Sequence, residues 1–176
     1  MIILQSIGVV DRGSITFFEG ELRSIFDTVK VRPAAKVPAS AHVPERDQLD
    51  GATILQSLPA PEPGAGDALL GVIDEDLFVA DLNFVFGLVY GSRAIISLAR
   101  LRQEFYSLSP NQDLFRERAL KEAVHELGHV FGLPHCSDRR CVMHFSNSIS
   151  DTDFKGWMYC ERCREMLEDS GVKASF

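Results

Sequence analysis

Residues 125–136 read HELGHVFGLPHC, and this stretch decides how the rest of the chain is interpreted. His125 and His129 are four residues apart, and Glu126 directly follows the first of them. Residues at this spacing lie one turn apart on the same face of a helix, so both imidazoles can reach one zinc ion. The stretch therefore predicts a helix that carries two ligands of a metal site.

His135 follows His129 by six residues, and Gly132 lies midway between them. Glycine enters the positive φ region without steric cost, so it can end the helix in a sharp turn that brings His135 to the same metal. Three nitrogen ligands leave the fourth position open, as in catalytic zinc sites. Glu126 is turned too far to be a ligand but can reach a metal-bound water as general base. The alternative is a pair of core histidines with an unrelated third.

The helix that carries this motif is expected to run from Asn111 to Phe131, with Asn111 or Ser109 as its N-cap. His125 and His129 are expected roughly opposite its apolar face and pointing into a cleft. The apolar face is expected to pack on a sheet and consists of Leu120, Ala123, Val124, Leu127, Val130 and Phe131.

Four cysteines follow, as CSDRRC over residues 136–141 and CERC over residues 160–163. Two close pairs of thiolates fit a closed tetrahedral structural zinc site, which would also stabilise a short, polar C-terminal tail. Two disulfides and a redox pair are the alternatives, although the βαβ context of a thioredoxin-like motif is missing. The predicted ligands are Cys136, Cys141, Cys160 and Cys163.

The composition is that of a soluble globular protein, with 176 residues, 45% hydrophobic residues and a net charge of −7. The length is most simply one domain, and the acidic balance argues against a nucleic-acid or anionic-membrane binder. No apolar run reaches the ~18 residues of a membrane helix. The first ten residues fit a buried strand rather than a signal peptide, so a cytoplasmic protein is expected.

Strand and helix patterns alternate along the chain, which predicts an α/β fold with helices packed on a mixed sheet. After residues 59–68, which read as a loop, residues 84–90 and 94–101 read as a hairpin. The other expected strands are residues 1–10 and 30–37, and residues 69–79 are expected to hold a third strand and a turn. The other expected helices are residues 17–29, 46–58 and 162–169.

The string HExxHxxGxxH is the signature of metzincins, and here it runs directly into the first cysteine of the second motif. With this interlocked pattern the chain resembles the archaemetzincin family of zinc metallopeptidases. The resemblance covers the chain from Gly71 onward. It implies one metzincin-like domain over residues 1–176, made of a sheet-and-helix part (1–132) and a loop-rich, zinc-stapled part (133–176). The sheet would be mostly parallel and twisted, with residues 84–90 as an antiparallel edge strand beside the cleft.

Met143 is expected to form the tight Met-turn beneath the catalytic metal. In some metzincins a tyrosine just after this turn also touches the metal. His144 and Phe145 stand there instead, so no tyrosine ligand is expected, and His144 is assigned to packing or surface. Many metzincins also carry a latency pro-segment, and no stretch here resembles one.

The sequence thus predicts a zinc metallopeptidase with Glu126 as general base and two Zn²⁺ per chain, one catalytic and one structural. It is expected to be a monomer that acts on peptides or proteins and binds neither nucleic acid nor membranes. Endopeptidase and aminopeptidase action stay open. A non-catalytic zinc protein is the competing class, and Glu126 argues against it because a structural site needs no base. A zinc module for nucleic acid is disfavoured by the acidic charge.

Overall fold

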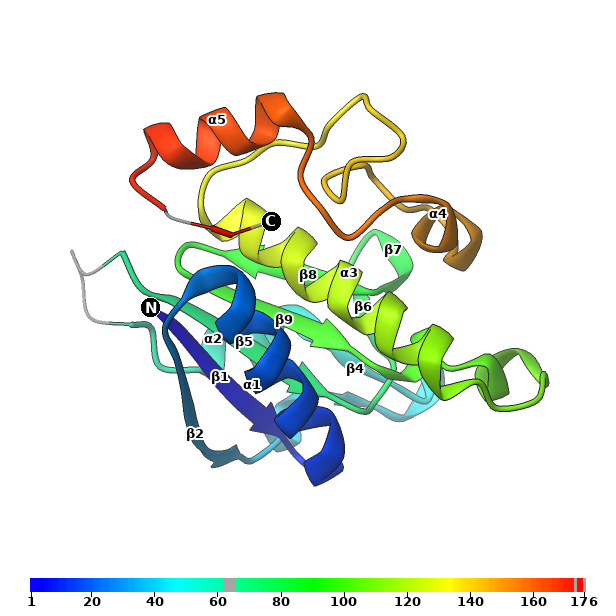
Figure 1. The fold of residues 1–176 in the computed structure, drawn as a ribbon. Coiled ribbons are helices and arrows are strands. Elements are labelled where there is room, and N and C mark those ends of the chain that lie inside the picture. Colours follow the sequence, from blue (N-terminus) through cyan, green and yellow to red (C-terminus); the bar gives the residue numbers. More distant parts are fainter. Residues whose placement is uncertain (62–65, 173, 176) are drawn as a thin grey trace.

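A computed structural model describes residues 1–61, 66–172 and 174–175. Its main feature is a five-stranded sheet with the order β2-β1-β5-β9-β8 (Figure 1). All neighbouring strands are parallel except β8, which is antiparallel to β9 at one edge. The predicted mostly parallel sheet with one antiparallel edge strand is thus confirmed, but the edge strand is Gly87–Tyr90 and not the whole of residues 84–90, because Leu82–Val85 belong to another sheet. The strands are β1 (Ile2–Ile7), β2 (Val29–Ala35), β5 (Ala68–Ile73), β8 (Gly87–Tyr90) and β9 (Arg93–Ser97).

Helices cover both faces of this sheet, which explains why β5 is buried at every position. On β1, Ile2 and Leu4 face the core cluster that α1 (Arg12–Phe26) and α3 (Gln112–Val130) complete. Ile3 and Ile7 face the opposite cluster, completed by α2 (Gly51–Ser57). Adjacent side chains on a strand point to opposite faces, so one apolar strand serves both layers.

A second sheet, which the sequence did not predict, has the order β3-β4-β6-β7. It corrects the helix expected over residues 46–58, because Gln48–Asp50 form a strand and the helix begins only at Gly51. Asp50 is extended and its side chain accepts a hydrogen bond from the backbone of Ala52, so it is an N-cap and not a helical residue. The strands are β3 (His42–Val43), β4 (Gln48–Asp50), β6 (Leu77–Val79) and β7 (Leu82–Val85).

Elsewhere between β1 and α3 the expected elements are present with other bounds: α1 begins at Arg12 and ends at Phe26, where a helix over residues 17–29 was expected, because Val29 already belongs to β2. The loop predicted over residues 59–68 lies partly outside the described residues, at 62–65, and β5 begins at Ala68. Helix α3 begins after Asn111, whose side chain accepts the Leu114 N–H at 3.0 Å, as predicted. Short 3₁₀ helices complete this part: Ala39–Ala41, Pro44–Arg46, Ala99–Leu101 and Gln103–Tyr106.

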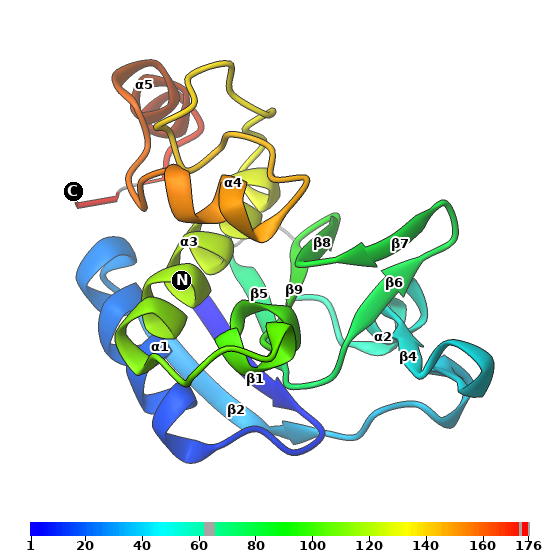
Figure 2. The ribbon, with the colours of Figure 1, turned by 90° about the vertical axis from the view of Figure 1, so that its right-hand side faces the viewer.

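The C-terminal segment lies over one side of α3, and the β6–β7 hairpin lies beyond β8 on the other side (Figure 2). The C-terminal segment carries two helices. Helix α5 (Glu161–Asp169) was predicted, and α4 (Ile149–Phe154) was not. The Asp151 carboxylate accepts both the N–H and the hydroxyl of Ser148 and so fixes the start of α4. Buried Met143 and Leu167 share one core cluster with α1 and α3, so the tail packs on the main core.

None of the helices in the described part of the chain is both long and apolar enough to cross a bilayer.

Candidate functional site

The three motif histidines converge at the C-terminal end of α3. His125 and His129 come from the helix, and their Nε2 atoms are 3.2 Å apart. Gly132 has a φ of +90° and its N–H donates to the His129 carbonyl, so the chain turns sharply and returns His135 to the helix. One ring nitrogen of each histidine lies within 4.8 Å of the others.

Backbone carbonyls orient two of these rings. His125 Nδ1 lies 2.7 Å from the Val142 carbonyl, and His129 Nδ1 lies 2.8 Å from the Leu133 carbonyl. A carbonyl only accepts, so each Nδ1 carries the proton and each Nε2 keeps a free lone pair. This is the usual outer support of metal-binding histidines.

The geometry fits zinc. Two nitrogens at ~2.0–2.1 Å from a tetrahedral zinc lie ~3.3–3.4 Å apart, close to the 3.2 Å between His125 and His129. Burial lowers the pKa of all three histidines, and for His125 the nearby Lys155 charge lowers the pKa further. The rings are therefore held neutral, which is the form that binds a metal.

Glu126 lies beside this cluster with only 6% of its surface exposed. Its carboxylate packs against Gly87 of β8, where an added Cβ would lie 2.6 Å from Oε1. Burial raises the pKa of Glu126 to about 8, with the Glu122 charge as the second cause, while Lys155 acts in the opposite direction. A buried carboxyl group of this kind can accept and return a proton.

A cleft of about 500 Å³ opens in front of the histidines and Glu126. Residues 82–89 form one wall, and residues 145–147 contribute to the other. Strand β8 is antiparallel to β9, and the Ser97 N–H donates to the Phe86 carbonyl just before β8. Every second residue from Phe86 onward therefore uses its backbone groups to pair with β9. Gly87 and Val89 are the other alternates, so their N–H and C=O groups point to the open edge.

Met143 is buried, and its sulfur packs against Gly128, the residue before His129. A side chain at Gly128 would collide with the Met143 sulfur, so this glycine lets the thioether approach the helix. The Tyr159 hydroxyl donates to the Val124 carbonyl at 2.7 Å, so the Tyr159 side chain also packs on this part of α3. Gly132 and Met143 were predicted from the sequence, whereas Gly128 and Tyr159 were not. The one signal for Gly128 is its place as a glycine inside the HELGH helix.

The four cysteines form a second cluster, and their sulfurs all lie within 4.8 Å of one another. Cys136 Sγ and Cys160 Sγ are 3.7 Å apart, whereas a disulfide requires ~2.05 Å. Sulfurs at ~2.3 Å from a tetrahedral zinc lie ~3.8 Å apart. The thiols are free in this structure, and their spacing fits a zinc ion.

Burial raises the pKa values of these thiols, and hydrogen bonds from backbone N–H groups lower them. Burial raises the pKa of Cys141 to about 11 and also raises the pKa of Cys163. Burial raises the pKa of Cys136 as well, but hydrogen bonds from the Asp138 N–H and from neighbouring thiols outweigh it, and that pKa is lowered. Four thiolates in this space need a bound cation to offset their charges.

The two clusters are joined by the peptide bond between His135 and Cys136. The Cys136 N–H donates to the Met143 carbonyl at 2.9 Å, and His144 Nδ1 lies 3.0 Å from the Cys136 carbonyl. His144 is outside both groups of candidate ligands and packs against the backbone that separates them.

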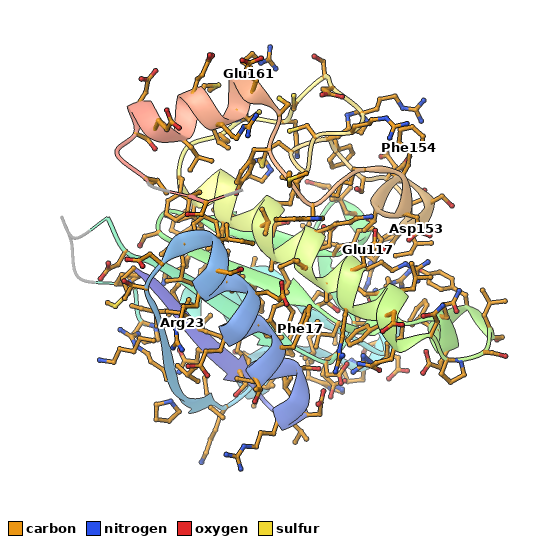
Figure 3. All side chains as sticks on the ribbon, in the orientation of Figure 1. Phe17, Arg23, Glu117, Asp153, Phe154 and Glu161 are labelled. Atoms are coloured by element: carbon orange, nitrogen blue, oxygen red, sulfur yellow. The ribbon has the colours of Figure 1, made fainter. Side chains whose placement is uncertain are left out.

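A buried ion pair lies next to His125 and was not predicted from the sequence. Lys155 is fully buried, and its Nζ lies 3.1 Å from Glu122 Oε1 and 3.5 Å from His125 Nδ1. Glu122 stands one turn before Glu126, and that spacing is the only signal in the sequence. Directly before Glu122, Lys121 contacts the Glu117 carboxylate and the Asp153 carbonyl and so ties α3 to α4. Glu117 and Asp153 are labelled in Figure 3.

Comparisons with known proteins agree with this geometry. Residues 65–169 match the model of "Peptidase family M54". The chain is 46% identical over 176 residues to an archaemetzincin of Methanocaldococcus jannaschii, covering 99% of this chain and 96% of the relative. The crystal structure of an archaemetzincin from Archaeoglobus fulgidus, complexed with malonate, is similar with a TM-score of 0.83 and 37% identity, covering 94% of this chain and 99% of the other. An archaemetzincin structure from Methanopyrus kandleri gives 0.80 and 35%, covering 97% and 94%.

Proposed function

The chain belongs to peptidase family M54, the archaemetzincins, which are zinc metallopeptidases, and on this premise we propose that it hydrolyses peptide bonds at the three-histidine site with Glu126 as general base. The observation that carries the proposal is the convergence of three neutral imidazoles beside a buried carboxyl group in an open cleft.

His125, His129 and His135 would hold the catalytic zinc. When bound there, zinc lowers the pKa of a water from ~15.7 to ~7 and polarises the scissile carbonyl. The carbonyls of Val142 and Leu133 fix the ring orientations of His125 and His129, so that both Nε2 lone pairs are free for the zinc ion that the site would hold.

Glu126 accepts the proton of the attacking water and passes it to the amine nitrogen that leaves. Its packing against Gly87 holds the carboxylate in one position between the helix and the edge strand. Burial and the adjacent Glu122 both favour proton uptake by Glu126, and Lys155 limits the effect.

The open edge of β8 positions the substrate. The backbone groups of Gly87 and Val89 pair with an extended peptide, which places its scissile amide over the histidines and Glu126. The apolar side chains along residues 82–89 contact the substrate on the same wall of the cleft.

The four cysteines hold a second, structural zinc ion, which gives two ions per chain. Their sulfur spacing supports this assignment, as does the hydrogen bond from the Cys160 N–H to Cys141 Sγ at 3.3 Å. All candidate ligands of both sites come from one chain, so a monomer is sufficient for activity.

The test is cleavage of a peptide library by the purified, zinc-loaded protein, with products identified by mass spectrometry. Cleavage is expected to stop on chelation and to return on addition of zinc. His129→Ala serves as the matched variant, because it removes one ligand of the three-histidine site and none of the cysteine site. Zinc-independent cleavage, or full activity of His129→Ala, would overturn the proposal.

A further inference from the structure

Two arginine–aspartate pairs join the segment after β5 to the segment after β9. Arg100 donates to both oxygens of Asp76, each at 2.7 Å, and Arg102 donates to one oxygen of Asp74 at 2.6 Å. Strands β5 and β9 are parallel neighbours, so both pairs lie at the same end of the main sheet. A bidentate pair such as that of Arg100 fixes the orientation of its guanidinium more firmly than a single contact does.

Each guanidinium also covers a phenylalanine ring, and the two rings belong to different parts of the molecule. The Arg100 Cζ lies 4.2 Å from the centroid of Phe84, and the Arg102 Cζ lies 4.2 Å from the centroid of Phe115. Phe84 belongs to β7 and lines the cleft. Phe115 belongs to α3 and is buried in the main core cluster. The Arg100 pair therefore supports the cleft wall, whereas the Arg102 pair supports the core.

The Asp76 carboxylate is also connected to the backbone of the same wall. The buried Gln48 donates from Nε2 to Asp76 Oδ2 at 2.8 Å and to the Asn83 carbonyl at 2.9 Å. Asp76 thus holds the ring of Phe84 through Arg100 and the backbone beside that ring through Gln48.

The cleft wall that carries Phe84 lies at the margin of the molecule. The β6–β7 hairpin extends beyond β8 (Figure 2), and β7 is at one end of the second sheet. Leu82 and Asn83 are exposed, and the pairing of β6 with β7 is irregular between Leu77 and Val79. Segments of this kind open locally at low free energy, and ordering such a wall on binding lowers the affinity for a ligand. A link that holds Phe84 in place therefore affects how tightly the cleft binds a peptide.

We propose that Asp76 and Arg100 are positioning residues for the substrate, which hold Phe84 as a preformed wall of the cleft and so set its affinity for peptides without taking part in hydrolysis. The inference rests on the proposed function, because the peptide is the ligand of the same cleft. A contact that binds substrate and transition state equally acts on KM and leaves kcat unchanged.

Arg100→Lys provides the test, because lysine keeps the charge and loses the planar, bidentate guanidinium. On a peptide that the zinc-loaded wild type cleaves, KM is expected to rise by about two- to tenfold, the value of one aromatic contact, with kcat and zinc content unchanged. Arg102→Lys is the matched control, because it makes the same change in the parallel pair and should keep the wild-type KM. An unchanged KM in Arg100→Lys, an equal rise in both variants, or a loss confined to kcat would overturn the inference.

The route through Phe84 is tested by a double-mutant cycle. Phe84→Leu removes the ring that Arg100 covers, so KM should rise in this variant as well. Adding Arg100→Lys to Phe84→Leu should then raise KM little further, because residues that act through one contact are not additive. Fully additive effects would mean that Arg100 does not act through Phe84 and would overturn the inference.

Binding without cleavage separates a failure of this inference from a failure of the proposed function. The probes are two zinc-chelating peptides, a tripeptide with a C-terminal hydroxamate and one with an N-terminal succinyl hydroxamate, which extend along the cleft in opposite directions from the metal. Acetohydroxamate, which reaches only the metal, is the reference ligand. In calorimetric titrations of zinc-loaded protein, Arg100→Lys should weaken at least one peptide by about two- to tenfold and leave acetohydroxamate unchanged.

That result supports the inference even if the wild type cleaves no peptide, an outcome that would overturn only the proposed function. Wild-type affinity of Arg100→Lys for both peptide hydroxamates would overturn the inference even if cleavage is observed. Equal weakening of acetohydroxamate would also overturn it, because the change would then lie at the metal and not at the wall.

Discussion

Gly87→Ala is a direct test of the contact between the edge strand and Glu126. The new Cβ would lie 2.6 Å from Oε1, 2.7 Å from Cγ and 2.8 Å from Cδ of Glu126. Ordinary carbon contacts are ~3.5–4.0 Å, so the carboxylate must move by about 1 Å. Glu126 is buried, so the movement disturbs its packing and is expected to cost about 1–3 kcal/mol of stability.

The larger effect is expected on catalysis. A displacement of ~1 Å at a reacting group can lower the rate by ~10²-fold. The backbone groups of Gly87 are unchanged, and the three atoms nearest the new Cβ all belong to Glu126, so zinc content and KM should stay near wild type while kcat falls.

The assay measures kcat, KM and zinc content on one preparation. Gly20→Ala is the matched control, because a Cβ there meets nothing within 4 Å and the helix should become more stable by up to ~1 kcal/mol. Wild-type kcat in folded, zinc-loaded Gly87→Ala would refute the placement of Glu126 against β8.

Three further predictions concern the metals and the buried ion pair. Cys160→Ser combined with Cys163→Ser should weaken zinc at the three-histidine site by ~10–100-fold, because the cysteine cluster anchors the backbone of His135; unchanged affinity, measured where the variant stays folded, would make the two sites independent. Graded chelation should remove the histidine-bound zinc before the cysteine-bound zinc, since the former site has fewer protein ligands and an open face; simultaneous loss, or one zinc per chain at full loading, would contradict this. Lys155→Met should lower the free energy of unfolding by ~3–5 kcal/mol by leaving the Glu122 charge buried and unpaired, and adding Glu122→Gln should recover part of it in denaturant titrations; no recovery would place the loss elsewhere.

Sequence patterns predicted the elements whose periodicity is strong. The apolar run at β1 and the capped helix α3 were placed correctly, and the mostly parallel sheet followed from the alternation of strands and helices. The helical spacing of α1 was recognised, but its bounds were placed too far along the chain, at residues 17–29 instead of Arg12–Phe26. The small second sheet was missed because its strands have only two to four residues, too few for a periodic signal. At residues 46–58, Asp50 was read as a helical residue when it is the cap of α2.

The candidate ligands were predictable because each motif is local in the sequence. The groups that surround them were not, because they come from distant segments. Lys155 reaches Glu122 and His125 across about 30 residues, and Gly87 reaches Glu126 across nearly 40. Such contacts depend on how α4 and β8 pack on α3, so they cannot be predicted from the spacing of residues in the sequence.

The central claim, that Glu126 acts as general base beside a zinc held by three histidines, is tested most directly by Glu126→Gln. Zinc stoichiometry and peptide cleavage are measured on the same sample, with wild type prepared in parallel. The amide cannot accept a proton, while the three imidazoles and their carbonyl partners remain. Zinc content and fold should be unchanged, with cleavage reduced by ~10²–10⁴-fold, the typical contribution of general acid–base catalysis. Full cleavage by zinc-loaded Glu126→Gln would contradict the assignment.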